Sequence, residues 1–201
     1  MIDEALASSS SQHRVLREVA ILAGRRTLNG SDTRMTAHFH VIFVCMGNIC
    51  RSPTAHAVFR VKLRAAGLAP CVRVDSAGTH DYHPGEPPDP RSQKHARRRG
   101  YELSGLRARH LADADFERAD LLLAMDDDNL AEIEERSPPE HRHKLGRLTA
   151  FCRVHQSPIV PDPYYGSARD FEQVLDLVED ACDGLLDHVR RELLARGSAG
   201  V

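Results

Sequence analysis

Tryptophan is absent from this 201-residue chain, and aromatic residues make up only 5% of it. No apolar run approaches the roughly 18 residues that a membrane-spanning helix needs, so we expect no membrane span. Lysine occurs only three times and the formal net charge is −2, which leaves no broad basic footprint for nucleic acid. The length suits one globular domain with a short appendage.

Cysteine is also scarce, and the five that occur are scattered and odd in number. This pattern argues against a disulfide framework and favours reduced thiols in a cytoplasmic protein. Twelve histidines are present, but none has zinc-site spacing to neighbouring cysteines. We therefore expect neither a metal nor a cofactor.

Residues 1–36 differ from the remainder of the chain. A polar run and a turn-rich Asn29–Asp32 segment surround a stretch whose apolar residues fit one face of a short helix. Asp3 and Glu4 stand where a signal peptide carries positive charge. We expect an N-terminal extension that is loosely ordered or forms a short helix. Alternatively, translation begins at Met35.

From residue 37 onward, predicted strands alternate with predicted helices. The strands are expected at 39–44, 72–74, 121–125 and 144–148, and the helices at 52–67, 91–99, 127–135 and 167–196. This alternation indicates an α/β fold in three layers, with a four-stranded parallel sheet flanked by helices, as in Rossmann-like proteins. Ligands of such folds bind beyond the carboxyl ends of the strands.

Segment 45–52 lies at the end of a predicted strand and contains residue types that suit phosphate binding. Its members are Cys45, Met46, Gly47, Asn48, Ile49, Cys50, Arg51 and Ser52. Consecutive amides in a tight strand-to-helix loop can curl around a phosphate, and the helix N-terminus adds positive potential. We expect Gly47 and Asn48 to tolerate left-handed backbone angles, Arg51 to bind two phosphate oxygens, and Ser52 to cap the helix.

The same environment would stabilise a thiolate at Cys45 and so lower the pKa of its thiol. The Ser52 hydroxyl could donate a hydrogen bond to that sulfur. Taken alone, a cysteine at the end of a strand is usually just a small buried residue. The complete string of residue types favours an activated nucleophile in an anion-binding loop.

Segment 44–53, Val-Cys-Met-Gly-Asn-Ile-Cys-Arg-Ser-Pro, resembles the active-site signature of the low-molecular-weight protein tyrosine phosphatases. Further similar segments follow in the same order at 75–78, 87–90, 124–126 and 162–166. The resemblance extends from about His38 to Arg196. It implies a phosphatase domain over residues 37–197 that hydrolyses phosphotyrosine through a phosphocysteine intermediate.

The resemblance also implies roles for residues outside the loop. Asp162 would be the general acid, and Tyr82, Tyr164 and Tyr165 would form the substrate rim. Cys50 would form a reversible, protective disulfide with Cys45. Asn48 would hold the loop in shape, with Ser76 as one partner, whereas no histidine aligns in the segment 104–109 where some relatives carry one.

Two other functions stay open from the sequence. Arsenate reductases share a related fold and loop, but they need further cysteines on a mobile segment, and no such pair stands out. A non-catalytic phosphate-binding module would lack the nucleophile or the acid. The resemblance implies phosphotyrosine proteins as partners, such as a bacterial tyrosine kinase, and a monomer or weak dimer.

Overall fold

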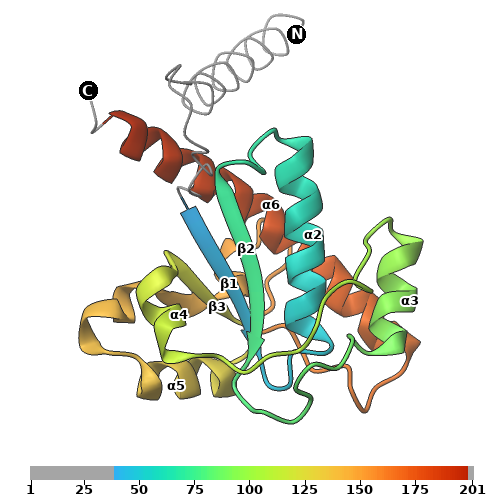
Figure 1. Cartoon of the computed structure of the whole chain (residues 1–201). Helices are drawn as coiled ribbons and strands as arrows, with labels where there is room; N and C mark the ends of the chain where they lie inside the picture. Colours follow the sequence, from blue (N-terminus) through green and yellow to red (C-terminus); the bar gives the residue numbers. More distant parts are fainter. Residues whose placement is uncertain (1–38, 199–201) are drawn as a thin grey trace, which may run out of the picture.

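The computed structural model describes residues 39–198. The predicted N-terminal extension at 1–36 lies outside this range. The centre of the molecule is a parallel sheet of four strands in the order β2-β1-β3-β4 (Figure 1). These strands are β1 (Phe39–Cys45), β2 (Val72–Gly78), β3 (Leu121–Ala124) and β4 (Leu145–Arg147).

Helices cover both faces of the sheet. On one face, α2 (Arg51–Ala65) and α6 (Ala168–Ser198) pack on Val41, Phe43 and their neighbours, with α3 (Pro90–Arg98) beside α6. On the other face, α4 (Asp113–Arg118) and α5 (Asp127–Arg136) bury Ile42 and Val44. Because alternate residues of a strand point to opposite faces, β1 contributes to both cores and is buried throughout. The predicted three-layer α/β fold is confirmed.

The predicted elements are present, with differences at their ends. The second strand continues four residues past Val74, to Gly78, because its carboxyl half pairs with the end of β1. Two short 3₁₀ helices, Pro139–Lys144 and Leu148–Phe151, flank β4. The sequence did not predict α4, which has only six residues and buries one large side chain, that of Phe116.

The start of α2 also differs from the prediction. The helix begins at Arg51 with Cys50 as its N-cap, so Ser52 is not the capping residue. The Ser52 side chain is instead buried and turned toward β1 and β2, where it contacts Cys45 and the carbonyl of Ala77. The residue that was expected to cap the start of the helix therefore contacts the loop cysteine and β2 instead.

The carboxyl ends of the inner strands meet at one edge of the sheet, at the bottom of Figure 1. Loop 45–51 is tied there to the loop after β2, because Thr79 donates its amide to the Cys45 carbonyl and His80 to that of Met46. Asp89 donates its amide to the Ile49 carbonyl. Across residues 39–198, no helix is long and apolar enough to cross a membrane.

Candidate active site

The loop between β1 and α2 is held in shape by Asn48. Its backbone is left-handed, with φ of 53°, and its side chain is buried. Its amide nitrogen donates to Ser52 Oγ at 2.8 Å, and its oxygen accepts from the Arg109 amide at 3.0 Å. The predicted left-handed geometry is confirmed for Asn48 but is wrong for Gly47, whose φ is not positive.

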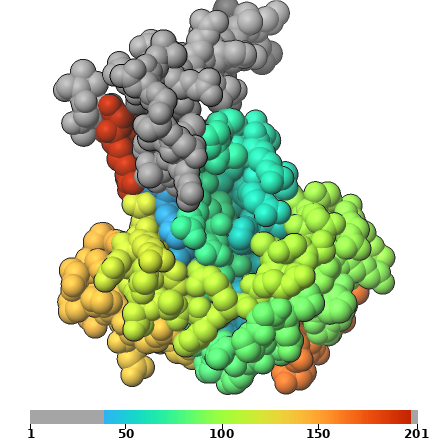
Figure 2. Space-filling model, in the orientation of Figure 1, coloured from blue at the N-terminus to red at the C-terminus, as the bar shows by residue number. Residues whose placement is uncertain are grey.

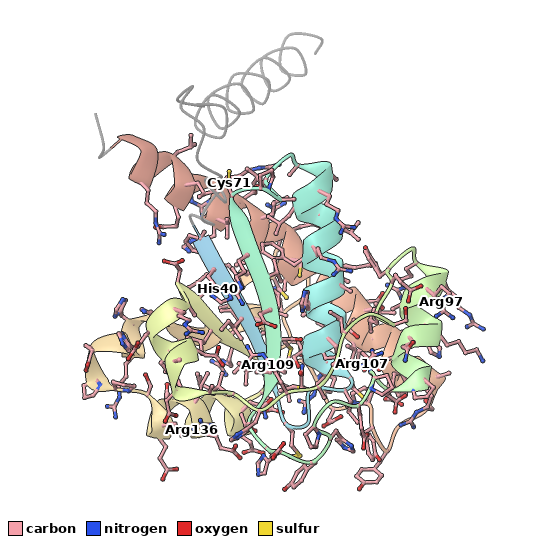
Figure 3. All side chains as sticks on the ribbon, in the orientation of Figure 1. His40, Cys71, Arg97, Arg107, Arg109 and Arg136 are labelled. Atoms are coloured by element: carbon pink, nitrogen blue, oxygen red, sulfur yellow. The ribbon has the colours of Figure 1, made fainter. Side chains whose placement is uncertain are left out.

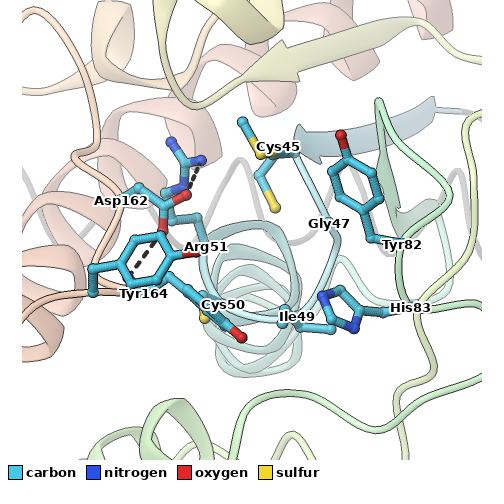
Figure 4. Close-up of a pocket in the computed structure, with 11 residues that line it drawn as sticks. Cys45, Gly47, Ile49, Cys50, Arg51, Tyr82, His83, Asp162 and Tyr164 are labelled. Atoms are coloured by element: carbon cyan, nitrogen blue, oxygen red, sulfur yellow. Dashed lines mark hydrogen bonds and ion pairs between the residues drawn. The ribbon is translucent and has the colours of Figure 1, made fainter.

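Gly47 is constrained by space rather than by backbone angle. A Cβ atom at this position would lie 3.1 Å from the His83 ring, which packs over the loop (Figure 4). Gly78 is tighter still, because a Cβ there would lie 2.7 Å from the Met46 carbonyl oxygen. The loop therefore lies directly against the end of β2 and the segment that follows it.

Cys45 ends β1 with its thiol at the base of the loop. Its sulfur lies 3.0 Å from Ser52 Oγ, which in turn accepts a hydrogen bond from Asn48. Only 3% of Cys45 is exposed, so reagents reach the sulfur through the pocket above the loop. A hydroxyl at this distance can donate to a sulfur anion, as the sequence predicted.

Arg51 is almost completely buried, yet its guanidinium is fully engaged. It forms ion pairs with Asp126 and, at 2.7 Å, with Asp162 Oδ2, and it donates to the Val160 carbonyl at 3.3 Å. Burial alone would lower its pKa, but Cys45 and the two carboxylates outweigh it and raise the pKa. Arg51 is therefore a fixed positive charge at the floor of the site.

Asp162 reaches the same place from a segment 111 residues later in the chain. It is exposed on the loop before α6, and its other oxygen accepts the Tyr164 amide at 3.1 Å. The carboxylate therefore has a solvent-facing position and one direct contact with the buried arginine. An acid in this position can exchange protons with water and also reach a group bound above the loop.

Together these residues line one pocket of about 240 Å³. Cys45 lies between Asp162 with Tyr164 on one side and Tyr82 with His83 on the other (Figure 4). The rest of the wall is given by Met46, Gly47, Ile49, Cys50, Arg51 and Tyr165. A nucleophilic sulfur, a buried cation, a carboxylate and aromatic walls are thus combined in one cavity.

Comparison with known proteins decides the family. The model of the low molecular weight phosphotyrosine protein phosphatases matches residues 40–195. This chain belongs to that family. A putative phosphatase of the family from Synechocystis is 43% identical, over 77% of this chain and 98% of its own. The human low molecular weight phosphotyrosine protein phosphatase is 39% identical, over 73% of this chain and 93% of its own.

Solved structures agree with the family assignment. The protein tyrosine phosphatase of Entamoeba histolytica superposes with a TM-score of 0.75 at 38% identity, covering 77% of this chain and 98% of its own. YfkJ from Bacillus subtilis superposes with a TM-score of 0.73 at 35% identity, covering 78% of this chain and 97% of its own. The chain is a cysteine-dependent protein tyrosine phosphatase, and the alternative functions are not favoured.

The three predicted rim tyrosines all line the pocket, but they differ in the side chains that pack against them. Tyr82 stacks on His80 with ring centroids 4.8 Å apart. Tyr164 contacts the guanidinium of Arg91 and meets Tyr165 edge to face at 4.9 Å. Tyr165 itself is 96% exposed, so its ring is open to a bound partner.

Ser76 is not a partner of Asn48, contrary to the sequence prediction. Its hydroxyl lies 3.3 Å from Nδ1 of His56, which points to it from α2. Burial lowers the pKa of His56 to about 4, with Asp75 opposing that shift and Arg60 and Arg109 adding to it. Asn48 instead contacts Ser52 and the Arg109 backbone, whereas the Ser76 hydroxyl contacts His56 of α2.

Three residues near the site were missed by sequence reasoning. Asp126 binds Arg51 and also caps α5 by accepting the Asn129 amide at 2.7 Å. Arg109 is fixed by Asp75 and Asp115 and so presents its own amide to Asn48, at the carboxyl end of β2 (Figure 3). His83 covers Gly47. Asp126 ends the family-like segment 124–126, and its position just after a predicted strand is the signal that could have identified it.

No group of three or more possible metal ligands occurs among residues 39–198. Cys50 is a free, buried thiol on the loop. Burial raises its pKa to about 12, helped by Asp89, Cys45 and Asp162 and opposed by Ser92. This thiol therefore stays protonated at neutral pH.

Proposed function

We propose that this phosphatase hydrolyses phosphotyrosine with Cys45 as nucleophile, Arg51 and the loop amides as phosphate ligands, and Asp162 as general acid. The observation that carries this proposal is the direct contact of Asp162 with Arg51 in the pocket where Cys45 lies. These three groups supply attack, charge stabilisation and proton transfer within one cavity.

The reaction runs in two displacements. The Cys45 thiolate attacks phosphorus in line, the phosphorus–oxygen bond to the tyrosine breaks, and Asp162 gives its proton to the leaving oxygen. The resulting phosphocysteine is attacked by water, from which the Asp162 carboxylate takes a proton. Phosphate leaves, and the sulfur departs as a thiolate that the Ser52 hydroxyl stabilises at 3.0 Å.

Arg51 and the loop serve both steps. Beside Arg51, the loop residues Met46, Gly47, Ile49 and Cys50 line the pocket with Cys45. The backbone amides of the loop, including those of Asn48 and Ser52, would donate to the phosphate oxygens. A planar guanidinium can bind two equatorial oxygens of the phosphoryl group at once. Asp126 holds one side of that guanidinium, which leaves the side now paired with Asp162 to meet the phosphate.

The pocket walls favour an aryl phosphate. Tyr82 and Tyr164 stand on opposite sides of Cys45, and Ile49 adds an apolar surface. A phosphotyrosine ring can pack between these groups while its phosphate reaches the loop. Phosphoserine is too short to use the aromatic walls and also lacks a stabilised leaving oxygen.

Cys50 supports a redox proposal for the same loop. Peroxide would oxidise the Cys45 thiolate to a sulfenic acid, and Cys50 would attack that sulfur, forming a disulfide and releasing water. The raised pKa of Cys50 keeps it from being the first thiol to react, because only a thiolate reacts readily with peroxide.

The Cys50→Ser variant tests this redox role. After treatment with hydrogen peroxide and then dithiothreitol, we expect wild type to regain most of its own initial activity. The recovered activity of the variant should be about fivefold lower than that of wild type. Without a resolving thiol, its Cys45 sulfenic acid is oxidised irreversibly to sulfinic and sulfonic acids. Cys71→Ser, a buried cysteine outside the pocket, is the matched control. Equal recovery in wild type and Cys50→Ser would remove the redox role.

We further propose a cytoplasmic location and a monomer or weak dimer, with a phosphotyrosine protein such as a bacterial tyrosine kinase as substrate. A reducing compartment keeps Cys45 active, which supports the location. We also propose 37–197 as the boundaries of the phosphatase domain, supported by the family match over 40–195.

A side-by-side assay separates the phosphatase from its alternatives. Wild type should release phosphate from a phosphotyrosine peptide at least about 100-fold faster than from the phosphoserine peptide of the same sequence. It should show no thioredoxin-dependent reduction of arsenate. The downstream cysteines agree with this expectation, because Cys182 is fully buried and burial raises the pKa of Cys152 to about 11. Arsenate reduction without phosphatase activity would reverse the assignment.

A further inference from the structure

Helix α3 carries a row of positive side chains along one flank. Arg91, Lys94 and Arg98 occur at i, i+3 and i+7, so they lie on the same side of the helix, and all three are exposed. We call these three residues the basic stripe. The helix has no acidic residue and forms an exposed edge of the molecule (Figures 1 and 2).

The stripe begins at the rim of the active-site pocket. Arg91 donates to the Tyr164 carbonyl at 2.9 Å, and its guanidinium lies 5.5 Å from the centre of the Tyr164 ring. Asp89 holds Arg91 through two contacts of 2.7 and 3.1 Å while capping the helix. From this fixed start, Arg98 lies about 10 Å further along the helix axis.

The outer part of the stripe is not neutralised. Within residues 39–198, neither Lys94 nor Arg98 forms an ion pair. The acidic groups near α3 are already engaged, because Arg99 binds Glu172, Asp176 and Glu179, while Arg97 binds Glu102. Arg97, three residues after Lys94, points to the outer side of the helix (Figure 3), where Glu102 pairs with it. Two cations thus remain available beside the pocket in a chain whose net charge is −2.

We propose that the basic stripe binds an acidic segment of the substrate polypeptide adjacent to the phosphotyrosine. This inference rests on the proposed function, because it needs phosphotyrosine in the pocket. An extended peptide rises about 3.3 Å per residue, so acidic residues within about five positions of the phosphotyrosine reach Lys94 and Arg98. A membrane or nucleic acid fits less well, since such polyanions engage larger basic surfaces than two free cations.

The test uses the double variant Lys94→Glu with Arg98→Glu on the full chain. Three phosphotyrosine peptides are compared, with three glutamates before the phosphotyrosine, three after it, or neutral residues on both sides. We expect kcat/KM for at least one acidic peptide to fall about tenfold at low salt, mainly through KM, because exposed charges act on encounter and binding. The neutral peptide and p-nitrophenyl phosphate should change less than about twofold, and the acidic-peptide loss should shrink in 0.5 M NaCl as charges are screened.

The control is Arg64→Glu with Arg73→Glu, which makes the same change in net charge at the opposite end of the sheet. Each pair includes one cation from the last turn of a helix, Arg98 or Arg64, so the charge change at a helix C-terminus is matched. An equal loss on acidic and neutral peptides, or the same loss in the control, would overturn the inference. So would unchanged peptide kinetics with lost binding to phosphatidylserine vesicles. If wild type cleaved no phosphotyrosine peptide, the proposed function itself would fail.

Discussion

Replacing Cys45 by serine is expected to lower kcat for a phosphotyrosine peptide by at least about 10⁴-fold. The Cys45 sulfur lies at the base of the proposed phosphate-binding loop, and the proposed chemistry depends on a thiolate that a serine hydroxyl does not match. Binding of the phosphate should persist, because the loop amides and Arg51 are unchanged. The measurement pairs steady-state kinetics with titration of phosphate or vanadate.

The retained binding is the informative half of this experiment. Serine is smaller than cysteine and fits beside Ser52 Oγ without a clash, so we expect the loop to keep its shape. Cys152→Ser, a half-buried cysteine outside the pocket, is the matched control and should keep its activity within about twofold. Full turnover by Cys45→Ser would rule out Cys45 as the nucleophile.

Replacing Asp162 by alanine is expected to depend on the leaving group. Tyrosine is a poor leaving group, with a phenol pKa near 10, so its departure needs a proton. We expect kcat for phosphotyrosine to fall by about 10²- to 10³-fold, the usual scale of general acid catalysis. For p-nitrophenyl phosphate, whose leaving oxygen needs less protonation, the loss of kcat in Asp162→Ala should be about tenfold smaller than for phosphotyrosine.

Leaving-group dependence separates proton transfer from a simple electrostatic effect. Asp162 also pairs with Arg51, so its loss could act through the arginine alone. An effect of that kind would slow all substrates equally. Asp126→Asn supplies the contrast, because Asp126 contacts Arg51 but is absent from the pocket wall. Equal losses for both substrates in Asp162→Ala would remove its role as acid.

The sequence predicted the fold well because its strong signals are local. Strand β1 is a short, apolar run between polar segments, and α6 repeats apolar residues at helical spacing over its whole length. Short elements carry too few residues for such a pattern, which explains why α4 was not predicted. The early stop predicted for β2 has a different cause. Its last residues are polar or small and are held by pairing with β1, a contact between distant segments.

The site residues, too, could be predicted where they lie in one continuous segment, but not where distant segments meet. Cys45, Arg51 and Ser52 could be read from one contiguous loop, although Ser52 contacts the sulfur instead of capping the helix. Asp162 was found only through family resemblance, because nothing in its local sequence indicates contact with an arginine 111 positions earlier. The Arg109 amide that fixes Asn48 was missed because nearly every residue type has a backbone N–H, so the amino-acid sequence does not show which one binds Asn48.

The most direct test of the proposed mechanism is to trap the intermediate. Asp162 should assist hydrolysis of the phosphocysteine as well as its formation, so Asp162→Ala should accumulate phosphoenzyme from p-nitrophenyl phosphate. Rapid quench followed by peptide mass spectrometry would locate the added phosphoryl group. We predict that it lies on Cys45, and that Cys45→Ser with Asp162→Ala carries none. A phosphoryl group on any other residue, or turnover with no phosphoenzyme in any variant, would contradict this mechanism.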